Sequence, residues 1–214
     1  MAEYSAAADL IASRGSKDVL DWGSGRGHMT QLLRERGLRV TAFDYDPAAD
    51  GTSVRQELPP FETEVVTSSD PIKLPFADGS FDAVLSMGVL EHVQDPDASL
   101  QELRRTLTEG GTLYCMKLPN SRSYLEAIAK QAGLYYHGKL EHDRVYTVLS
   151  AREMFERNGF DVTSVKLANM LPLTVPGSVA TFASPLIWKA NILLARIPGL
   201  RAFATNVEVI ARVS

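Results

Sequence analysis

Cysteine is nearly absent from this chain, with Cys115 the only one among 214 residues. A single cysteine excludes a disulfide within the chain, and its apolar neighbours predict a buried, inert thiol. The sequence shows no apolar run long enough to cross a bilayer and no basic-then-apolar segment at its amino terminus, so we expect a cytoplasmic protein. Basic residues are outnumbered, and the net charge of −4 argues against general nucleic-acid binding.

A short apolar strand followed by a glycine-rich turn dominates the first part of the chain. The strand over 19–22 leads into Gly23-Ser24-Gly25-Arg26-Gly27, and an amphipathic helix follows. Glycines permit positive φ and leave room for a ligand to approach the backbone. The turn also directs amide N–H groups and the positive end of the helix at that ligand. We therefore predict a nucleotide-like ligand held by Gly23, Ser24, Gly25 and Gly27.

Asp21 lies at the end of this strand, beneath the turn, and its charge indicates which class of ligand binds there. A carboxylate there repels a pyrophosphate but favours a ligand that carries an ammonium and a sulfonium. The dinucleotide fingerprint would place its third glycine where this chain has His28, and there is no Gly-Lys-Ser/Thr phosphate loop. Asp21 is thus assigned to the binding of a cationic cofactor.

At these residues the sequence resembles the class I S-adenosylmethionine (SAM)-dependent methyltransferases, whose first motif is an acid followed by alternating glycines. The segments 70–76 and 89–93 extend the resemblance to the small-molecule, type 11 group, which includes enzymes of ubiquinone and menaquinone biosynthesis. The resemblance implies SAM as cofactor and S-adenosylhomocysteine as product. It also implies a Rossmann-like sheet and a helix over 3–13 that covers the cofactor.

Three further segments are expected to complete the cofactor site. Asp44 ends the second strand, where a carboxylate accepts hydrogen bonds from both ribose hydroxyls. In a following loop, Asp70 is placed to accept from the adenine amine while Ile72 packs on the ring. The alternatives are an Asp44 that only caps a turn and an Asp70 that is only solvated. The predicted contacts from these segments also include Tyr45, Pro71 and Met87.

The Glu91-His92 pair follows the fourth strand, at the edge of the sheet where ligands bind in open α/β sheets. His92 is a candidate general base, and Glu91 a candidate substrate contact. The alternative is a histidine that only supports the fold. Some quinone-pathway relatives hold a metal on Glu-x-x-Glu-His; here Gly88 occupies the first position, so only two ligands remain and no bound metal is expected.

Two insertions depart from the minimal fold. The first, over 121–147, is rich in histidine, arginine and tyrosine, and we predict a substrate lid. His142 is a second catalytic candidate, with Arg144 and Tyr146 as substrate contacts; polar rim packing is the alternative. The second, over 168–205, contains a nearly apolar, helix-like stretch over 185–197 with basic residues Lys189, Arg196 and Arg201. It is open to three interpretations: burial against the domain, a homodimer interface, or peripheral membrane contact through 185–201.

The sequence as a whole predicts one α/β domain over 1–214 with a doubly wound, seven-stranded sheet, mostly parallel with an antiparallel last strand. We expect a SAM-dependent methyltransferase that acts on oxygen or carbon of a small, hydrophobic or lipid-linked acceptor. A nicotinamide oxidoreductase and a non-catalytic SAM-binding protein are the alternatives. We also expect an edge-like strand over 63–67, a helix that begins at Asp95-Pro96 and ends at Gly110-Gly111, a helix over 124–131, and closing strands over 160–167 and 207–213. A capping box at Ser150–Glu153 is expected to begin a helix that ends at Gly159.

Overall fold

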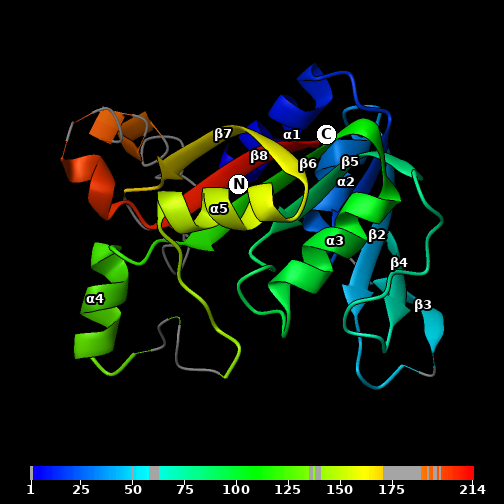
Figure 1. The fold of residues 1–214 in the computed structure, drawn as a ribbon, viewed down its shortest axis with the longest axis horizontal. Coiled ribbons are helices and arrows are strands. Elements are labelled where there is room, and N and C mark those ends of the chain that lie inside the picture. Colours follow the sequence, from blue (N-terminus) through cyan, green and yellow to red (C-terminus); the bar gives the residue numbers. More distant parts are fainter. Residues whose placement is uncertain are drawn as a thin grey trace.

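The structure is a computed structural model, and it describes residues 2–49, 51–57, 63–134, 137, 141–170, 189–191, 193–194, 197 and 199–214. One twisted sheet crosses the molecule, with helices on both of its faces (Figure 1). The strands are β1 (Asp18–Trp22), β2 (Arg39–Tyr45), β3 (Thr52–Glu57), β4 (Thr63–Ser68), β5 (Phe81–Met87), β6 (Leu107–Pro119), β7 (Phe160–Ala168) and β8 (Asn206–Val213). The helices are α1 (Ala2–Ser13), α2 (His28–Arg34), α3 (Pro96–Thr106), α4 (Tyr124–Gln131), α5 (Val148–Arg157) and the 3-10 turn η1 (Leu200–Phe203).

The sheet has eight strands in the order β3-β4-β2-β1-β5-β6-β8-β7. Strands β4, β2, β1, β5 and β6 run parallel, and β8 is antiparallel to both of its neighbours. The doubly wound α/β fold and the antiparallel last strand are therefore confirmed. Both closing strands were predicted, and they pair as an antiparallel hairpin although the 168–205 insertion separates them.

The predicted count of seven strands is wrong by one, because β3 forms an additional edge strand. The sequence over 48–63 is mixed, with Gly51, Pro59 and Pro60, and is too broken to predict a helix, but Thr52–Glu57 pairs antiparallel with β4 along its whole length. Backbone pairing to a neighbouring strand stabilises a segment whose own sequence pattern is weak. Consequently β4, predicted as an edge strand, lies between β2 and β3.

Alternate residues of the strands build two hydrophobic cores, one on each face of the sheet. On one face α3 and α5 pack over side chains such as Leu20, Val84 and Leu113. On the other, α1 and α2 pack over side chains such as Val19, Leu85 and Tyr114. Figure 1 shows α3 and α5 in front of the sheet and α1 and α2 behind it. The lone cysteine, Cys115, is buried in the first core, as predicted, and burial raises the pKa of its thiol.

Two predicted helix ends are wrong. Helix α3 ends at Thr106, and Leu107 already pairs with Phe81, so the Gly110-Gly111 pair lies inside β6 instead of ending the helix. The capping box of α5 is formed by Thr147 and Ser150, three residues earlier than predicted. The Thr147 hydroxyl accepts from the Ser150 amide at 3.0 Å, and the Ser150 hydroxyl accepts from the Thr147 amide at 2.9 Å. A hydroxyl serves as the reciprocal acceptor here, where the prediction relied on Glu153.

The two insertions are described in part. The first contributes α4 and the loop over 141–147, while the second contributes the segments around 189–194 and η1. Most of the predicted 185–197 helix, including Trp188 and Arg196, lies outside the described residues. Within the described part of the chain, no helix has the length and apolar character needed to span a membrane.

Candidate active site

The glycine-rich turn joins β1 to α2 and lies at the carboxyl edge of the parallel strands. Gly23 and Gly25 adopt φ of 75° and 55°, in the left-handed region that favours glycine. The amides of Gly23 and Ser24 both donate to the carbonyl of Phe43 on β2, at 2.9 Å, and the Gly25 amide donates to Asp44 at 3.1 Å. The turn is therefore fastened to the end of the neighbouring strand, which places its backbone beside Asp44.

Replacing Gly23 with alanine is expected to destabilise the protein far more than replacing Gly25. A Cβ at Gly23 would lie 2.4 Å from Cγ2 of Val89, whereas one at Gly25 meets no atom within 4 Å. Both variants carry the strain of positive φ, about 1–2 kcal/mol, and overpacking adds about 1–3 kcal/mol to Gly23→Ala alone. Chemical denaturation of both variants measures the difference. Equal losses would contradict the predicted contact with Val89.

Asp21 lies beneath the turn and is almost completely buried, with 2% of its surface exposed. The Thr30 hydroxyl on α2 donates to its Oδ2 at 2.6 Å. Burial raises the pKa of Asp21 to about 6, because the charged form loses its hydration. The carboxyl is thus set back under the ligand-binding turn instead of lining the cavity above it.

The raised pKa of Asp21 predicts a pH dependence of stability. The unfolded chain ionises this group near pH 4 and the folded chain near pH 6, so the free energy of unfolding falls as pH rises between these values and stays lower above them. Asp21→Asn removes this dependence, and we expect the variant to be more stable than the wild type at pH 8 by up to about 3 kcal/mol. Urea unfolding at pH 4, 6 and 8 measures it, with Asp161→Asn, exposed on β7, as the control. A wild-type pH profile that Asp21→Asn leaves unchanged would exclude the assignment.

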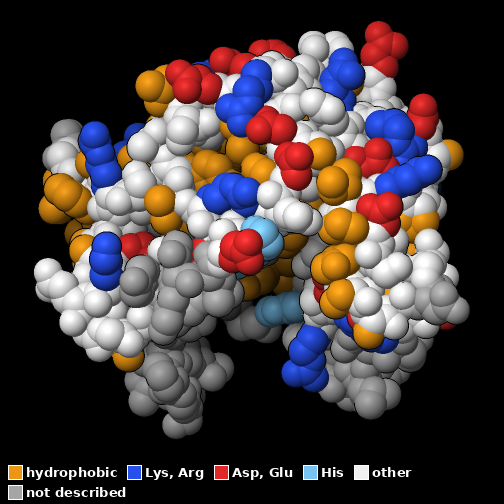
Figure 2. All heavy atoms as spheres, turned by 60° about the horizontal axis from the view of Figure 1, so that its bottom comes forward, with side chains coloured by type: hydrophobic (Ala, Val, Ile, Leu, Met, Phe, Trp, Pro, Cys, Tyr) orange, Lys and Arg blue, Asp and Glu red, His pale blue; other side chains and the backbone are white. Residues whose placement is uncertain are grey.

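A cavity of about 420 Å³ opens above the turn at the carboxyl edge of β1, β2 and β5. Figure 2 views the molecule from this edge and shows a hollow with histidine and hydrophobic side chains at its base. Of the predicted site residues, the lining contains Gly23, Asp44, Tyr45, Asp70, Pro71, His92 and His142. The structure therefore brings together, around one cavity, residues from five separate segments of the sequence.

The lining also contains residues that the sequence analysis missed, namely Trp22, Phe43, Leu74, Gly88, Val89, Val93 and Gln94. Most of them directly flank predicted residues at the ends of β1, β2 and β5. Their position after a strand could have indicated them, but alternation of side chains leaves open which neighbours face the cavity. The apolar members give the cavity walls suited to a flat ring.

Asp44 and Asp70 supply the carboxylates of the lining. Asp44 accepts from the Gly25 and Tyr45 amides at 3.1 and 3.0 Å, with the Arg55 guanidinium 3.6 Å away, and burial raises its pKa. Asp70 caps its own loop by accepting from the amides of Ile72 and Lys73, and these hydrogen bonds lower its pKa. Each carboxylate therefore accepts hydrogen bonds from nearby backbone amides and also lines the cavity. A structural role does not exclude a role in ligand binding for either residue.

Glu91 and His92 lie on the loop that follows β5. Glu91 is buried, with 2% of its surface exposed, whereas the His92 ring reaches the cavity. Nδ1 of His92 lies 2.8 Å from Asp143, a residue of the first insertion whose side chain is 1% exposed. Sequence reasoning singled out the neighbouring His142 and missed Asp143, because only the tertiary fold brings the insertion back over His92.

Arg144 and Tyr146 hold this insertion against the Glu91 loop. The Arg144 guanidinium donates to the carbonyls of Val93, Gln94 and His142, and its amide donates to the Glu91 carbonyl. Tyr146 is buried in the core, where its hydroxyl lies 3.5 Å from the Leu90 carbonyl. Both residues line a second, neighbouring cavity of about 790 Å³, as does Ile72. A direct contact between Arg144 or Tyr146 and an acceptor stays a prediction.

The remaining predicted residues lie around the turn. Gly27 is the N-cap of α2, and Met87 packs against the core formed with α1 and α2. The Ser24 hydroxyl is buried and has no hydrogen-bond partner among the described residues. An unpartnered hydroxyl in a glycine-rich turn fits a polar ligand such as the amino-acid end of SAM.

Curated relatives match a little over half of the chain. A demethylmenaquinone methyltransferase of Thermus thermophilus is 33% identical over 116 residues, which cover 53% of this chain and 52% of the relative. A ubiquinone biosynthesis O-methyltransferase of Chromobacterium violaceum is 31% identical over 125 residues, 56% of this chain and 53% of that protein. The chain thus spans about half the length of the curated relatives it matches.

Solved structures match the fold over almost the whole chain. The 1,6-didemethyltoxoflavin-N1-methyltransferase of Burkholderia thailandensis, with bound 1,6-didemethyltoxoflavin and S-adenosylhomocysteine, superposes with a TM-score of 0.60 at 20% identity. The match covers 99% of this chain and 78% of that one. A SAM-dependent methyltransferase of Archaeoglobus fulgidus has a TM-score of 0.58 at 20% identity, covering 96% and 94%. Since residues 2–165 match the family model of the methyltransferase domain, the chain belongs to this family of class I SAM-dependent methyltransferases.

Proposed function

We propose that the protein transfers the methyl group of SAM to a small, hydrophobic acceptor. The observation that carries this proposal is one cavity whose lining contains Asp44 and Asp70 together with His92 and His142. The two carboxylates suit a nucleoside, and the histidines suit an acceptor that must lose a proton. One cavity therefore serves both partners of a group transfer.

Each part of the cavity has a task in this reaction. Asp44 accepts hydrogen bonds from the ribose hydroxyls, Asp70 accepts from the adenine amine, and the Gly23–Gly27 turn holds the amino-acid end of the cofactor. SAM supplies an electrophilic methyl group on a sulfonium, and transfer needs the acceptor atom in line with the breaking bond. The protein contributes alignment and the exclusion of water, for which Trp22, Phe43 and Val89 provide apolar walls.

The acceptor is inferred from the lining and from the relatives. The curated relatives are named for demethylmenaquinone and for ubiquinone biosynthesis, so we infer an acceptor with an apolar ring that is methylated at oxygen or carbon. His92 is placed to act on the proton that a hydroxyl acceptor must lose. Methyl transfer from labelled SAM to demethylmenaquinone and to a prenylated catechol tests this class, with short-chain analogues as comparison. Transfer to none of them would exclude it.

Calorimetry separates this function from its alternatives. We expect S-adenosylhomocysteine to bind and NAD not to bind, because the third-glycine position of the dinucleotide fingerprint is His28. Tight binding of NAD would favour an oxidoreductase. Binding of S-adenosylhomocysteine with no methyl transfer to any small molecule of a cell extract would favour a non-catalytic protein.

We further propose that the 185–201 region contacts an anionic membrane that carries the acceptor. Leu193, Ile197 and Leu200 are exposed by 62%, 44% and 45%, whereas the polar Asn191 is buried and accepts from the Met170 amide. Exposed apolar side chains flanked by Lys189 and Arg201 suit an interface with anionic lipid. Co-sedimentation with anionic vesicles is expected, and it should be lost in Leu193→Asp/Leu200→Asp. Absence of binding, together with a dimer in solution, would assign the patch to self-association instead.

A further inference from the structure

We propose that Glu91, His92 and His137 form a binding site for a divalent transition metal ion next to the cofactor cavity. The sequence offered only the first two ligands, because Gly88 stands where a third was sought. The tertiary fold supplies His137 from the first insertion. One ligand atom from each of the three residues lies within 4.8 Å of the other two.

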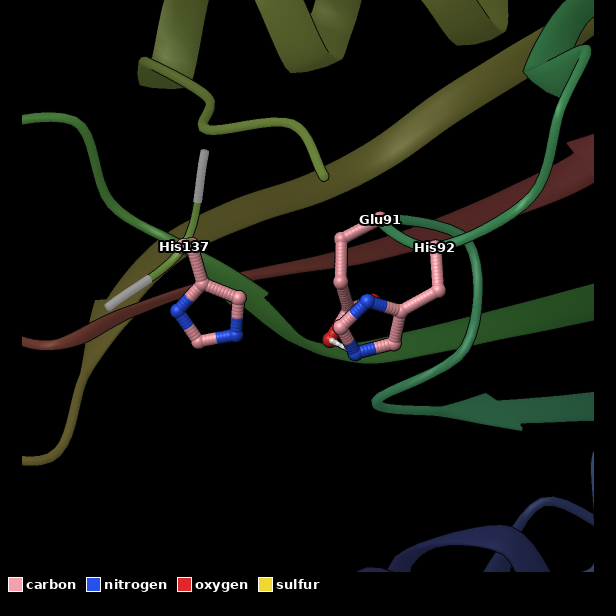
Figure 3. Close-up of side chains that lie close together, drawn as sticks. All are labelled: Glu91, His92 and His137. Atoms are coloured by element: carbon pink, nitrogen blue, oxygen red, sulfur yellow. Dashed lines mark ion pairs between the residues drawn. The ribbon is translucent and has the colours of Figure 1, made fainter. Parts of the chain in front are cut away.

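The three side chains face one another across a small gap. Oε1 of Glu91 lies 3.8 Å from Nε2 of His92, and the rings of His92 and His137 are stacked with centroids 5.8 Å apart. Figure 3 shows one nitrogen of the His137 ring directed towards the Glu91–His92 pair. Metal–ligand bonds of about 2.0–2.2 Å bring ligand atoms to within about 4 Å of each other, so a small inward shift of His137 closes the site.

Each histidine is oriented by a carboxylate on its other side. Asp143 lies 2.8 Å from Nδ1 of His92, and Glu126 of α4 lies 2.6 Å from Nδ1 of His137. Glu126 also accepts from the His137 amide at 2.8 Å, which fixes the backbone at this position. A carboxylate on Nδ1 fixes the tautomer and presents Nε2 as the ligand atom, the arrangement that metal-binding histidines almost always have. The Asp143–His92 and Glu126–His137 pairs both face Glu91. This arrangement is typical of a metal site and is not expected of polar residues that lie together by chance.

The surroundings of Glu91 give independent support for a cation at this position. Its side chain is 3% exposed, and Oε2 has no hydrogen-bond partner among the described residues. An unpartnered carboxylate oxygen in the interior is costly, and a bound cation would compensate it.

The ligand set indicates the kind of metal. Two imidazoles and one carboxylate suit Zn²⁺, Fe²⁺, Co²⁺ or Mn²⁺, whereas Mg²⁺ and Ca²⁺ prefer oxygen ligands alone. Three protein ligands leave a coordination position for an acceptor oxygen, and a metal ion lowers the pKa of a hydroxyl that it binds. This chemical role rests on the proposed methyl transfer, but binding of the ion does not, so the two can fail separately.

Metal titration of the full chain tests the site directly. We expect one equivalent of Zn²⁺ to bind by calorimetry, and Co²⁺ to give visible absorption bands of a low-symmetry site with nitrogen ligands. His137→Ala and Glu91→Gln should each weaken Zn²⁺ binding by about tenfold or more. His142→Ala is the matched control, a histidine of the same insertion outside the cluster, and should leave Zn²⁺ affinity unchanged.

Binding of S-adenosylhomocysteine, measured in the same variants, shows that each is folded. Wild-type affinity for Zn²⁺ no higher than that of His137→Ala would overturn the proposal. Equal losses in His142→Ala and His137→Ala would overturn it as well, because binding would then be spread over surface histidines. Failure of methyl transfer with Zn²⁺ binding intact would instead count against the proposed acceptor.

Discussion

Asp44→Ala is expected to weaken S-adenosylhomocysteine binding by about 100-fold, which corresponds to roughly 3 kcal/mol. Asp44 lines the cavity at the end of β2, where one carboxylate can accept from two ribose hydroxyls. Loss of the acceptor leaves both hydroxyls without partners in a partly dry site. The same change removes the acceptor of the Gly25 amide, so the turn also loses one of the hydrogen bonds that hold it to β2. Calorimetric titration measures the loss.

Two variants separate the ribose contact from general effects of charge and folding. Asp44→Asn keeps an oxygen for the Gly25 amide but lacks the charge, and we expect an intermediate loss of affinity. Asp46→Asn removes a charge from the adjoining turn while keeping an oxygen for the Ala48 amide, and it should bind normally. Unchanged affinity in Asp44→Ala would refute the ribose role.

His92→Ala is expected to lower turnover by about 100-fold or more while S-adenosylhomocysteine affinity changes by less than about threefold. The ring reaches the cavity and is held by Asp143, so its removal affects the acceptor more than the nucleoside. Single-turnover methyl transfer and calorimetry on the same sample separate the two effects. Assays with and without added Zn²⁺ distinguish a proton acceptor from a metal ligand, because only the second makes turnover depend on the ion.

Thermal unfolding of the variant addresses the other interpretation of His92. A histidine that only supports the fold would lower the melting temperature of His92→Ala together with its activity. Asp143→Asn, which keeps the shape of the partner but not its charge, is expected to reduce turnover about tenfold at an unchanged melting temperature. Full activity in His92→Ala would exclude His92 both as the proton acceptor and as a ligand of a metal ion that the reaction needs.

The sequence predicted the strands and helices of the core well where their patterns were strong. Tyr124–Gln131 was predicted residue for residue, because its apolar spacing and its Ser123 cap are local signals. The edge strand β3 was missed, because pairing with β4 stabilises it and its own sequence carries a weak pattern. The start of α5 was misplaced by three residues, because Thr147 and Ser150 both resemble caps and only hydrogen bonding selects between them.

The sequence by itself determined which functional groups lie at the strand ends: the glycine turn after β1, Asp44 at the end of β2 and Glu91-His92 after β5. Parallel strands bring such ends to one edge, so local order along the chain was enough to predict a shared site. The tertiary structure alone decided how the first insertion returns to that edge. Asp143 and Glu126 orient two histidines, and His137 joins Glu91, through contacts between segments far apart in the sequence. No spacing rule encodes such contacts, because they depend on the path of a loop over the folded sheet.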